Sequence, residues 1–269
     1  MSSYIRVSGG LALALVLVVA CVALRISGGG PLPIDTTIMS AANRLHTPHR
    51  TSVVDVATQA FSPWAIAVWT ALAALILYVC DASVLRAVML IATVASAGAL
   101  CATLKVLAAR PRPPVADQVG VLETTYSFPS GHVAGTAALV VAAASLVARS
   151  AGGGARTALW VCAVVAVVFV CATRLYLGVQ WMSDVVAAVV VACAATLLVL
   201  PIVELAVAKW TSRRRSVLIV AILLVLSAVA VILAVDGDGI SDGASAARQA
   251  GHLAGVWATE YAEWFSAHH

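Results

Sequence analysis

Seven apolar runs, each close to the length of a membrane-spanning helix, dominate this chain of 269 residues. A helix needs about 20 apolar residues to cross a bilayer, and strands exposed to lipid would leave backbone polar groups unpaired. With 62% hydrophobic and only 10% charged residues, the composition excludes a soluble globular protein. We therefore expect an all-α fold, a polytopic membrane helical bundle with spans at about 7–25, 61–80, 84–107, 132–149, 157–176, 182–203 and 216–235.

The chain divides into a six-span core and a C-terminal extension. We place the core at 1–203, and we expect the remaining residues, 204–269, to hold an additional span (about 216–235) and an amphipathic tail lying in the headgroup region. The first run could instead be a cleaved signal peptide, because the residues before Cys21 resemble a lipoprotein cleavage box. Its length, extended back to Val7, favours a retained span.

The distribution of basic residues indicates which loops face the cytoplasm. With the N-terminus inside, the cytoplasmic loops satisfy the positive-inside rule, and the polar stretch 27–60 and the loop 108–129 lie outside. Within the first of these, Ile34 to Leu45 predicts a short amphipathic helix on the surface. The net charge of +4 is small and scattered, so nucleic-acid binding is not indicated. The cytoplasmic cations in this arrangement are Arg86, Arg149, Arg156, Lys209, Arg213, Arg214 and Arg215.

A Pro-Ser-Gly-His turn, Pro129 to His132, precedes the fourth apolar run. Ser130 is a suitable N-cap for the helix that follows. A helix N-terminus offers free N–H groups and a positive dipole to an anion, and Gly131 lets the backbone approach closely. His132 falls in the first helical turn, where an imidazole with an ordinary pKa near ~6.5 suits general-acid catalysis.

Three cations flank this turn at the ends of other apolar runs. Lys105 closes the third run, Arg112 follows it, and Arg174 lies near the end of the fifth. Charged side chains in membrane spans are costly and mark functional sites, and arginine matches phosphate oxygens bidentately. We interpret the three cations as a phosphate site. Because prolines on both sides of Arg112 fix the backbone direction, we expect Arg112 to point inward and Arg110 to lie at the rim.

Gln180 and Asp184 are four residues apart and share one helical face. An Asp at this spacing is suited to orient a His at position 180 and raise its nucleophilicity. Residue 180 is instead a glutamine, whose amide is not nucleophilic and takes no proton at neutral pH. The pattern predicts a phosphate site with an orienting carboxylate and without a nucleophile at position 180.

Together these residues resemble the type 2 phosphatidic acid phosphatase superfamily, which shares its site with vanadium haloperoxidases. The three family motifs correspond to residues 105–113, 129–132 and 173–184. In the third motif, Thr173 replaces a Ser and Gln180 replaces the nucleophilic His. The resemblance covers about residues 7–203, so the seventh span and the tail lie outside it.

The resemblance implies a metal-independent lipid phosphatase that uses no cofactor and forms a covalent phosphohistidine. His132 would be the general acid, Asp184 the orienting residue, and Gln180 occupies the nucleophile position. Family members in membranes act on phosphatidic acid, phosphatidylglycerol phosphate or undecaprenyl pyrophosphate. The implied partners are therefore a lipid phosphate and the bilayer, at the extracytoplasmic face of a bacterial inner membrane. The implied phosphate ligands are Lys105, Arg112, Ser130, Gly131 and Arg174.

Gln180 leaves three interpretations open. The chain is a phosphatase with an engineered or recent change at position 180, or it binds lipid phosphates without hydrolysing them. In the third, water attacks directly, or a histidine of the first outer loop, His46 or His49, replaces the nucleophile. An anion transporter is not supported, because the sequence has neither an internal repeat nor a pair of broken helices.

Overall fold

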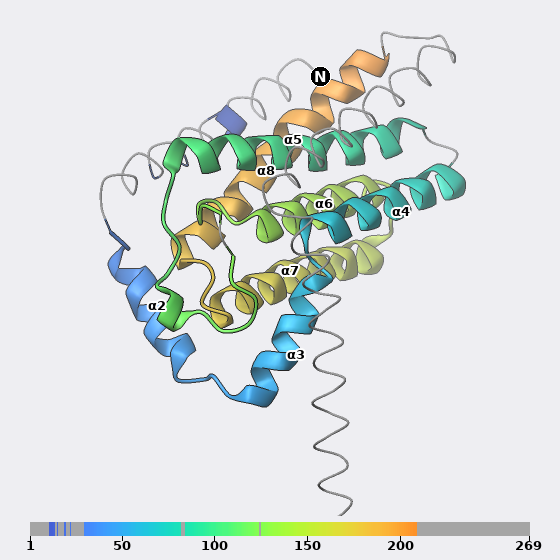
Figure 1. Ribbon diagram of the computed structural model, residues 1–269. Coiled ribbons are helices and arrows are strands. Elements are labelled where there is room, and N and C mark those ends of the chain that lie inside the picture. The colour runs from blue at the N-terminus through green and yellow to red at the C-terminus, as the bar shows by residue number, and fades with distance from the viewer. Residues whose placement is uncertain are drawn as a thin grey trace, which may run out of the picture.

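The computed structural model describes residues 11–13, 15, 19, 22, 30–81, 84–123 and 125–208, and the regular structure in these segments is helical (Figure 1). The polypeptide forms a bundle of long apolar helices with two shorter helices at one end. The elements are α2 (Pro33–Asn43), α3 (Pro48–Gln59), α4 (Pro63–Asp81), α5 (Val84–Ala108), the 3-10 helix η1 (Val115–Asp117), α6 (Gly131–Val147), α7 (Gly153–Tyr176) and α8 (Met182–Ala208).

The long helices agree with the apolar runs of the sequence. Helices α4, α5, α7 and α8 are long and apolar enough to cross a membrane, and α6 is a shorter apolar helix. The second to sixth expected spans are therefore confirmed as helices, although α8 continues to Ala208, past the expected core boundary at 203. The span at 216–235 and the tail lie outside the described residues, as does the span at 7–25 except for isolated helical positions between 11 and 22.

Two surface helices precede the first long helix of the described region. The expected amphipathic helix is confirmed as α2, which begins with a proline and whose Asp35 carboxylate accepts the Leu32 N–H at 2.9 Å. Helix α3 was not expected, because its polar sequence has no apolar run. Thr47 is its N-cap, with a hydroxyl that accepts the Arg50 N–H, and the helix begins at Pro48, where the missing N–H costs nothing.

Small residues allow α5, α6 and α8 to pack closely at the centre of the bundle. Ala97, Ala137 and Ala192 are fully buried where these helices meet. Small side chains let helix backbones approach within a membrane, where van der Waals packing replaces the hydrophobic effect as the driving force. Helix α7 packs mainly on α6 and leaves valines of its other face exposed. That face is suited to contact lipid.

The helix ends that carry the sequence motifs meet at one end of the bundle. Helices α5 and α7 finish there, and α6 and α8 begin there (Figure 1). Helix α2 packs against α7 and α8, and α3 packs against α7. The fold thus places two polar helices and the loop 109–130 around the motif residues.

Candidate functional site

Arg112 and Arg174 converge on one carboxylate. Arg112 Nη2 lies 2.6 Å from Glu123 Oε2, and Arg174 Nη2 forms an ion pair with Glu123 Oε1. Both arginine side chains are buried, and that of Glu123 is 17% exposed. Arg174 also donates to the Thr58 hydroxyl of α3 at 3.3 Å. The two motif arginines, far apart in sequence, therefore present their guanidinium groups to a single anionic group.

Glu123 was not among the candidate site residues, because it is an acid in a loop without periodicity. Its place is set by the loop around it. Arg112 Nε donates to the Thr125 carbonyl at 2.7 Å, and its Nη2 donates to the Thr125 hydroxyl at 2.9 Å. Earlier in the loop, Asp117 accepts from Asn43 of α2 at 2.7 Å. Such a long-range arrangement leaves no signal in a local pattern.

Gly178 fixes the same loop against the turn between α7 and α8. Its φ of +67° is in the left-handed region, and a Cβ at this position would lie 2.1 Å from the Asp117 carbonyl oxygen. The Val119 N–H also donates to the Leu177 carbonyl at 2.9 Å. Only glycine combines this backbone conformation with so close an approach. The loop that carries Glu123 is thereby attached to the helix that carries Arg174.

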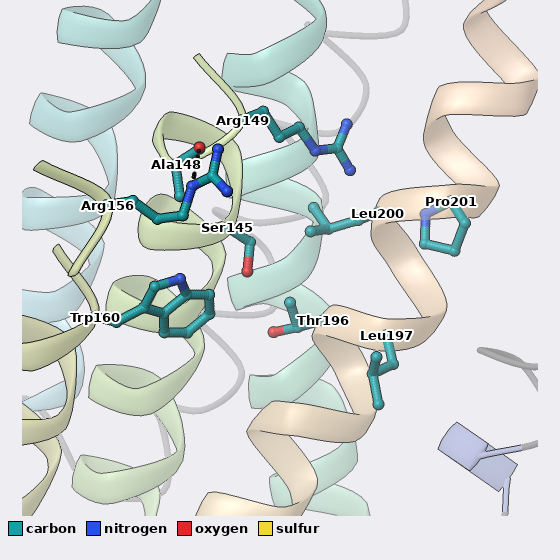
Figure 2. A pocket seen from close by; sticks show the side chains of 9 residues that line it. All are labelled: Ser145, Ala148, Arg149, Arg156, Trp160, Thr196, Leu197, Leu200 and Pro201. Carbon is teal, nitrogen blue, oxygen red and sulfur yellow. Dashed lines mark hydrogen bonds between the residues drawn. The ribbon is translucent and has the colours of Figure 1, made fainter. Parts of the chain in front are cut away.

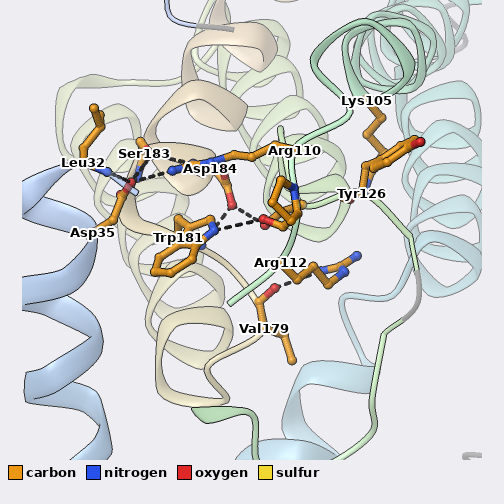
Figure 3. A network of polar contacts seen from close by, with 12 residues as sticks. Leu32, Asp35, Lys105, Arg110, Arg112, Tyr126, Val179, Trp181, Ser183 and Asp184 are labelled. Carbon is orange, nitrogen blue, oxygen red and sulfur yellow. Dashed lines mark hydrogen bonds and ion pairs between the residues drawn. The ribbon is translucent and has the colours of Figure 1, made fainter. Parts of the chain in front are cut away.

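Arg110 is buried, contrary to the expectation that it would lie at the rim. Its Nη2 lies 2.6 Å from Asp35 Oδ2, and its Nη1 pairs with Asp184 Oδ1 (Figure 3). The guanidinium group also donates to the Ser183 hydroxyl at 2.8 Å. The expectation failed because it ignored α2, which brings Asp35 over the start of α8. Arg112 does point inward, as expected.

Asp35 has a role that sequence reasoning missed. Its carboxylate accepts the Ser183 N–H at 2.8 Å and the Ser183 hydroxyl at 2.9 Å, in addition to the contacts with Leu32 and Arg110. Burial alone raises the pKa of the Asp35 carboxyl, but the hydrogen bonds from Ser183, Arg110 and Leu32 together hold it below its ordinary value. Asp35 therefore remains ionised and fixes α2 to the start of α8.

Asp184 contacts other groups than the side chain at position 180. Besides Arg110, its carboxylate accepts the Ser127 hydroxyl and the Trp181 N–H, the latter at 2.9 Å. The residue expected to orient a nucleophile at position 180 thus makes its hydrogen bonds elsewhere, and the Gln180 amide pairs with Arg112 and Ser127. The carboxylate instead holds the loop before α6 and the first turn of α8 together.

Gln180 is fully buried and paired at both ends of its amide. With its oxygen toward Arg112, it accepts from Arg112 Nη1, and its nitrogen donates to the Ser127 carbonyl at 2.7 Å. Arg112 Nη1 also donates to the Val179 carbonyl at 2.9 Å. An amide suits this position because it offers an acceptor to a cation and a donor to a carbonyl.

The start of α6 offers one uncommitted hydroxyl. Ser130 occupies the N-cap position, as expected, but its hydroxyl does not cap the helix and, among the described residues, has no hydrogen-bond partner although it is buried. Its N–H donates to the Asp184 carbonyl at 3.3 Å. A Cβ added at Gly131 would meet no atom within 4 Å. The helix end therefore combines a free hydroxyl with open space beside the backbone.

The remaining predicted residues lie at the same end of the bundle. His132 is in the first turn of α6 and half-buried. Lys105, in the last turn of α5, donates from Nζ to the Tyr126 carbonyl at 2.6 Å and thus contacts the same loop as Arg112 (Figure 3).

The residues of this site lie within a region that matches a known protein family. Residues 86–208, which include every motif residue described above, match the PAP2 superfamily. The region that carries all three motifs is therefore assigned to the PAP2 superfamily. A solved structure of similar fold is that of the first transmembrane PAP2 type phosphatidylglycerolphosphate phosphatase from Bacillus subtilis, with a TM-score of 0.60 and 20% identity. The alignment covers 75% of this chain and 98% of that one. No curated protein matches the chain significantly.

Within this PAP2 fold, the first outer histidine has a structural contact. A ring nitrogen of His46 lies 2.6 Å from the Tyr176 carbonyl oxygen, and the two rings pack edge to face. This contact fixes the segment between α2 and α3 to the end of α7. It gives no support to the interpretation in which His46 replaces the nucleophile.

Proposed function

We propose that this PAP2 protein binds the phosphate headgroup of a lipid at the end of the bundle where its three motifs meet. The observation that carries the proposal is the convergence of Arg112 and Arg174 on the two carboxylate oxygens of Glu123. A phosphate monoester presents the same feature, two or more anionic oxygens on one centre, and arginine recognises both groups in the same way. Glu123 thus marks where a phosphate would lie.

The start of α6 supplies further donors to the same proposed ligand. The Ser130 hydroxyl is available, and the space beside Gly131 lets a ligand oxygen approach the helix N-terminus. Lys105 and His132 flank this position at the ends of α5 and α6. We propose the extracytoplasmic face for this end of the bundle, on the basis of the positive-inside distribution of basic loop residues.

We further propose that the chain hydrolyses its ligand far more slowly than a PAP2 protein with His at position 180. Gln180 has no lone pair basic enough to attack phosphorus, and its amide is committed to Arg112 and Ser127. Asp184 is likewise committed to Arg110, so the group that would orient a nucleophile already serves another purpose. Binding without efficient turnover is the function that this geometry supports best.

A second candidate is a working phosphatase in which water attacks the phosphorus directly. His132, in the first turn of α6 beside the open space at Gly131, favours it, because an imidazole there can protonate the leaving oxygen. The ligand classes for either function are phosphomonoester and pyrophosphate lipids, such as phosphatidic acid, undecaprenyl pyrophosphate and the phosphatidylglycerol phosphate on which the Bacillus subtilis relative acts.

Binding and phosphate release, measured on the same preparations, test both candidates. We expect the purified chain to bind vanadate and lipid phosphates, and Arg174→Ala to abolish that binding. Gln180→His should raise phosphate release by several orders of magnitude, since loss of a covalent nucleophile costs that much in other enzymes. Unchanged binding in Arg174→Ala would refute the site. Family-like turnover by the unaltered chain would instead favour the second candidate.

A further inference from the structure

A cavity lies at the opposite end of the bundle from the PAP2 motifs. It has a volume of about 380 Å³ and opens between α6, α7 and α8 (Figure 2). Cavities of about 300–1,000 Å³ are the size that holds small ligands. Its position follows from the sequence, because α6 and α8 begin, and α7 ends, at the motif end. The residues that matter for its chemistry are Ser145, Arg149, Arg156, Trp160, Thr196 and Leu200.

Two arginines give one end of the cavity a positive charge. Arg149 and Arg156 direct their guanidinium groups to the same end, near the last turn of α6 (Figure 2). Arg156 Nε donates to the Ala148 carbonyl at 3.2 Å and is held there. Arg149 pairs with Glu204 at 3.2 Å, and both side chains are about half exposed. Exposed pairs are worth little, so an anion can recruit Arg149 at small cost.

The rest of the cavity is less polar. Leu197 of α8 and Trp160 of α7 line the part farther from the arginines, and Leu200 of α8 adds apolar surface nearer to them (Figure 2). Helix α7 packs mainly on α6 and contacts α8 sparingly, so the boundary between α7 and α8 beside the cavity is weakly packed. Val161 and Val164, on α7 close to Trp160, are exposed and suited to lipid. The cavity is therefore cationic at its outer end and apolar toward the middle of the bundle.

We propose that this cavity binds an anionic phospholipid of the leaflet opposite the PAP2 site, with its phosphate between Arg149 and Arg156. Basic pockets between membrane helices recognise anionic headgroups in this way. The glycerol region would lie beside Ser145 and Thr196, and an acyl chain would follow Trp160 along the boundary of α7 and α8. The bound lipid would join α7 to α8 where protein contacts are few. The site is independent of the proposed function, since it shares no residue with the motifs.

Lipid retention by the full chain tests this proposal. We would measure adducts by native mass spectrometry after mixing the protein with phosphatidylglycerol or with phosphatidylcholine in a neutral detergent. We expect retention of phosphatidylglycerol at least about tenfold above phosphatidylcholine. Arg149→Gln should reduce that retention about tenfold, with little risk to folding, because Arg149 is half exposed and its ion pair within the described residues is with the half-exposed Glu204. Ser145→Leu, which fills the cavity and leaves both arginines, should do the same.

Matched controls separate this cavity from other sources of binding. Arg86→Gln removes one charge at the same end of the bundle outside the cavity and should retain phosphatidylglycerol fully, as should Arg174→Ala at the PAP2 site. Soluble glycerol phosphate should not displace the lipid. The proposal is overturned if Arg149→Gln and Ser145→Leu both retain phosphatidylglycerol like the parent chain, or if phosphatidylcholine is retained equally well. Loss of the phosphatidylglycerol adduct in Arg174→Ala, or its displacement by glycerol phosphate, would overturn it too.

Discussion

Arg174, at the end of α7, forms a buried ion pair with Glu123 from the loop between α5 and α6. Arg112 holds the other oxygen of the same carboxylate. An anion that enters the proposed phosphate site must therefore take the place of Glu123. The apparent dissociation constant equals the intrinsic constant divided by the fraction of molecules that are competent to bind. An internal carboxylate therefore weakens phosphate binding more steeply as the fraction of molecules without it in the site becomes small.

Glu123→Gln is expected to tighten phosphate binding. The neutral amide competes poorly for two guanidinium groups. If the Glu123 carboxylate occupies the site in about nine molecules of ten, its removal lowers the dissociation constant for vanadate or phosphatidic acid about tenfold, and this is the change that we expect. Isothermal titration gives the constants. Asp117→Asn is the matched control, because Asp117 is an acid of the same loop that contacts Asn43 instead. Equal or weaker binding by Glu123→Gln would show that Glu123 does not compete with the ligand.

Asp35→Asn is expected to destabilise the chain by about 3 kcal/mol. Removing one partner of a buried ion pair costs about 3–5 kcal/mol, and Asp184 still pairs with Arg110, which keeps the loss at the lower end. Thermal unfolding in detergent measures the change. Glu204→Gln, which removes the partner of the exposed Arg149, should have almost no effect. Equal effects of the two substitutions would contradict the assignment of Arg110 as a buried anchor.

The same carboxylate predicts a dependence of stability on pH. The folded pKa of Asp35 lies below its unfolded value of about 3.9, so its contribution is complete above about pH 4 and disappears as pH falls through the folded pKa. The parent chain should therefore lose melting temperature on acidification below about pH 4 more steeply than Asp35→Asn. Parallel curves for the two proteins would mean that Asp35 is not the group that titrates.

Two glycines near the site are expected to respond oppositely to alanine. Gly178→Ala should destabilise the fold, because its φ is +67° and the new Cβ would collide with the Asp117 carbonyl. Gly131→Ala should fold normally, since a Cβ there meets no atom within 4 Å, but should weaken vanadate binding if the ligand lies against the start of α6. Melting curves and vanadate titrations of both variants check this. Unaltered binding in Gly131→Ala would remove the helix N-terminus from the proposed site.

Most of the fold could be predicted from the sequence because membrane helices leave strong local signals. The runs that became α4, α5, α7 and α8 are apolar over the full width of a bilayer, and unpaired backbone groups exclude other structures in lipid. The motif order also placed Lys105, His132 and Arg174 at helix ends on one side. Helix α3 was not predicted, because its polar residues form no apolar run and its start depends on a local cap.

The sequence by itself determined a helical membrane protein with cations, a Ser-Gly-His turn and no nucleophile at position 180. Only the tertiary structure decided which groups these residues contact. In the folded protein, Arg110 is buried between Asp35 and Asp184. The Gln180 amide pairs with Arg112 and Ser127. Glu123 forms ion pairs with both Arg112 and Arg174. The physical reason is that hydrophobic periodicity is local, whereas ion pairs in a buried site join segments separated by many residues, and their choice of partner depends on how loops and surface helices pack over the helix ends.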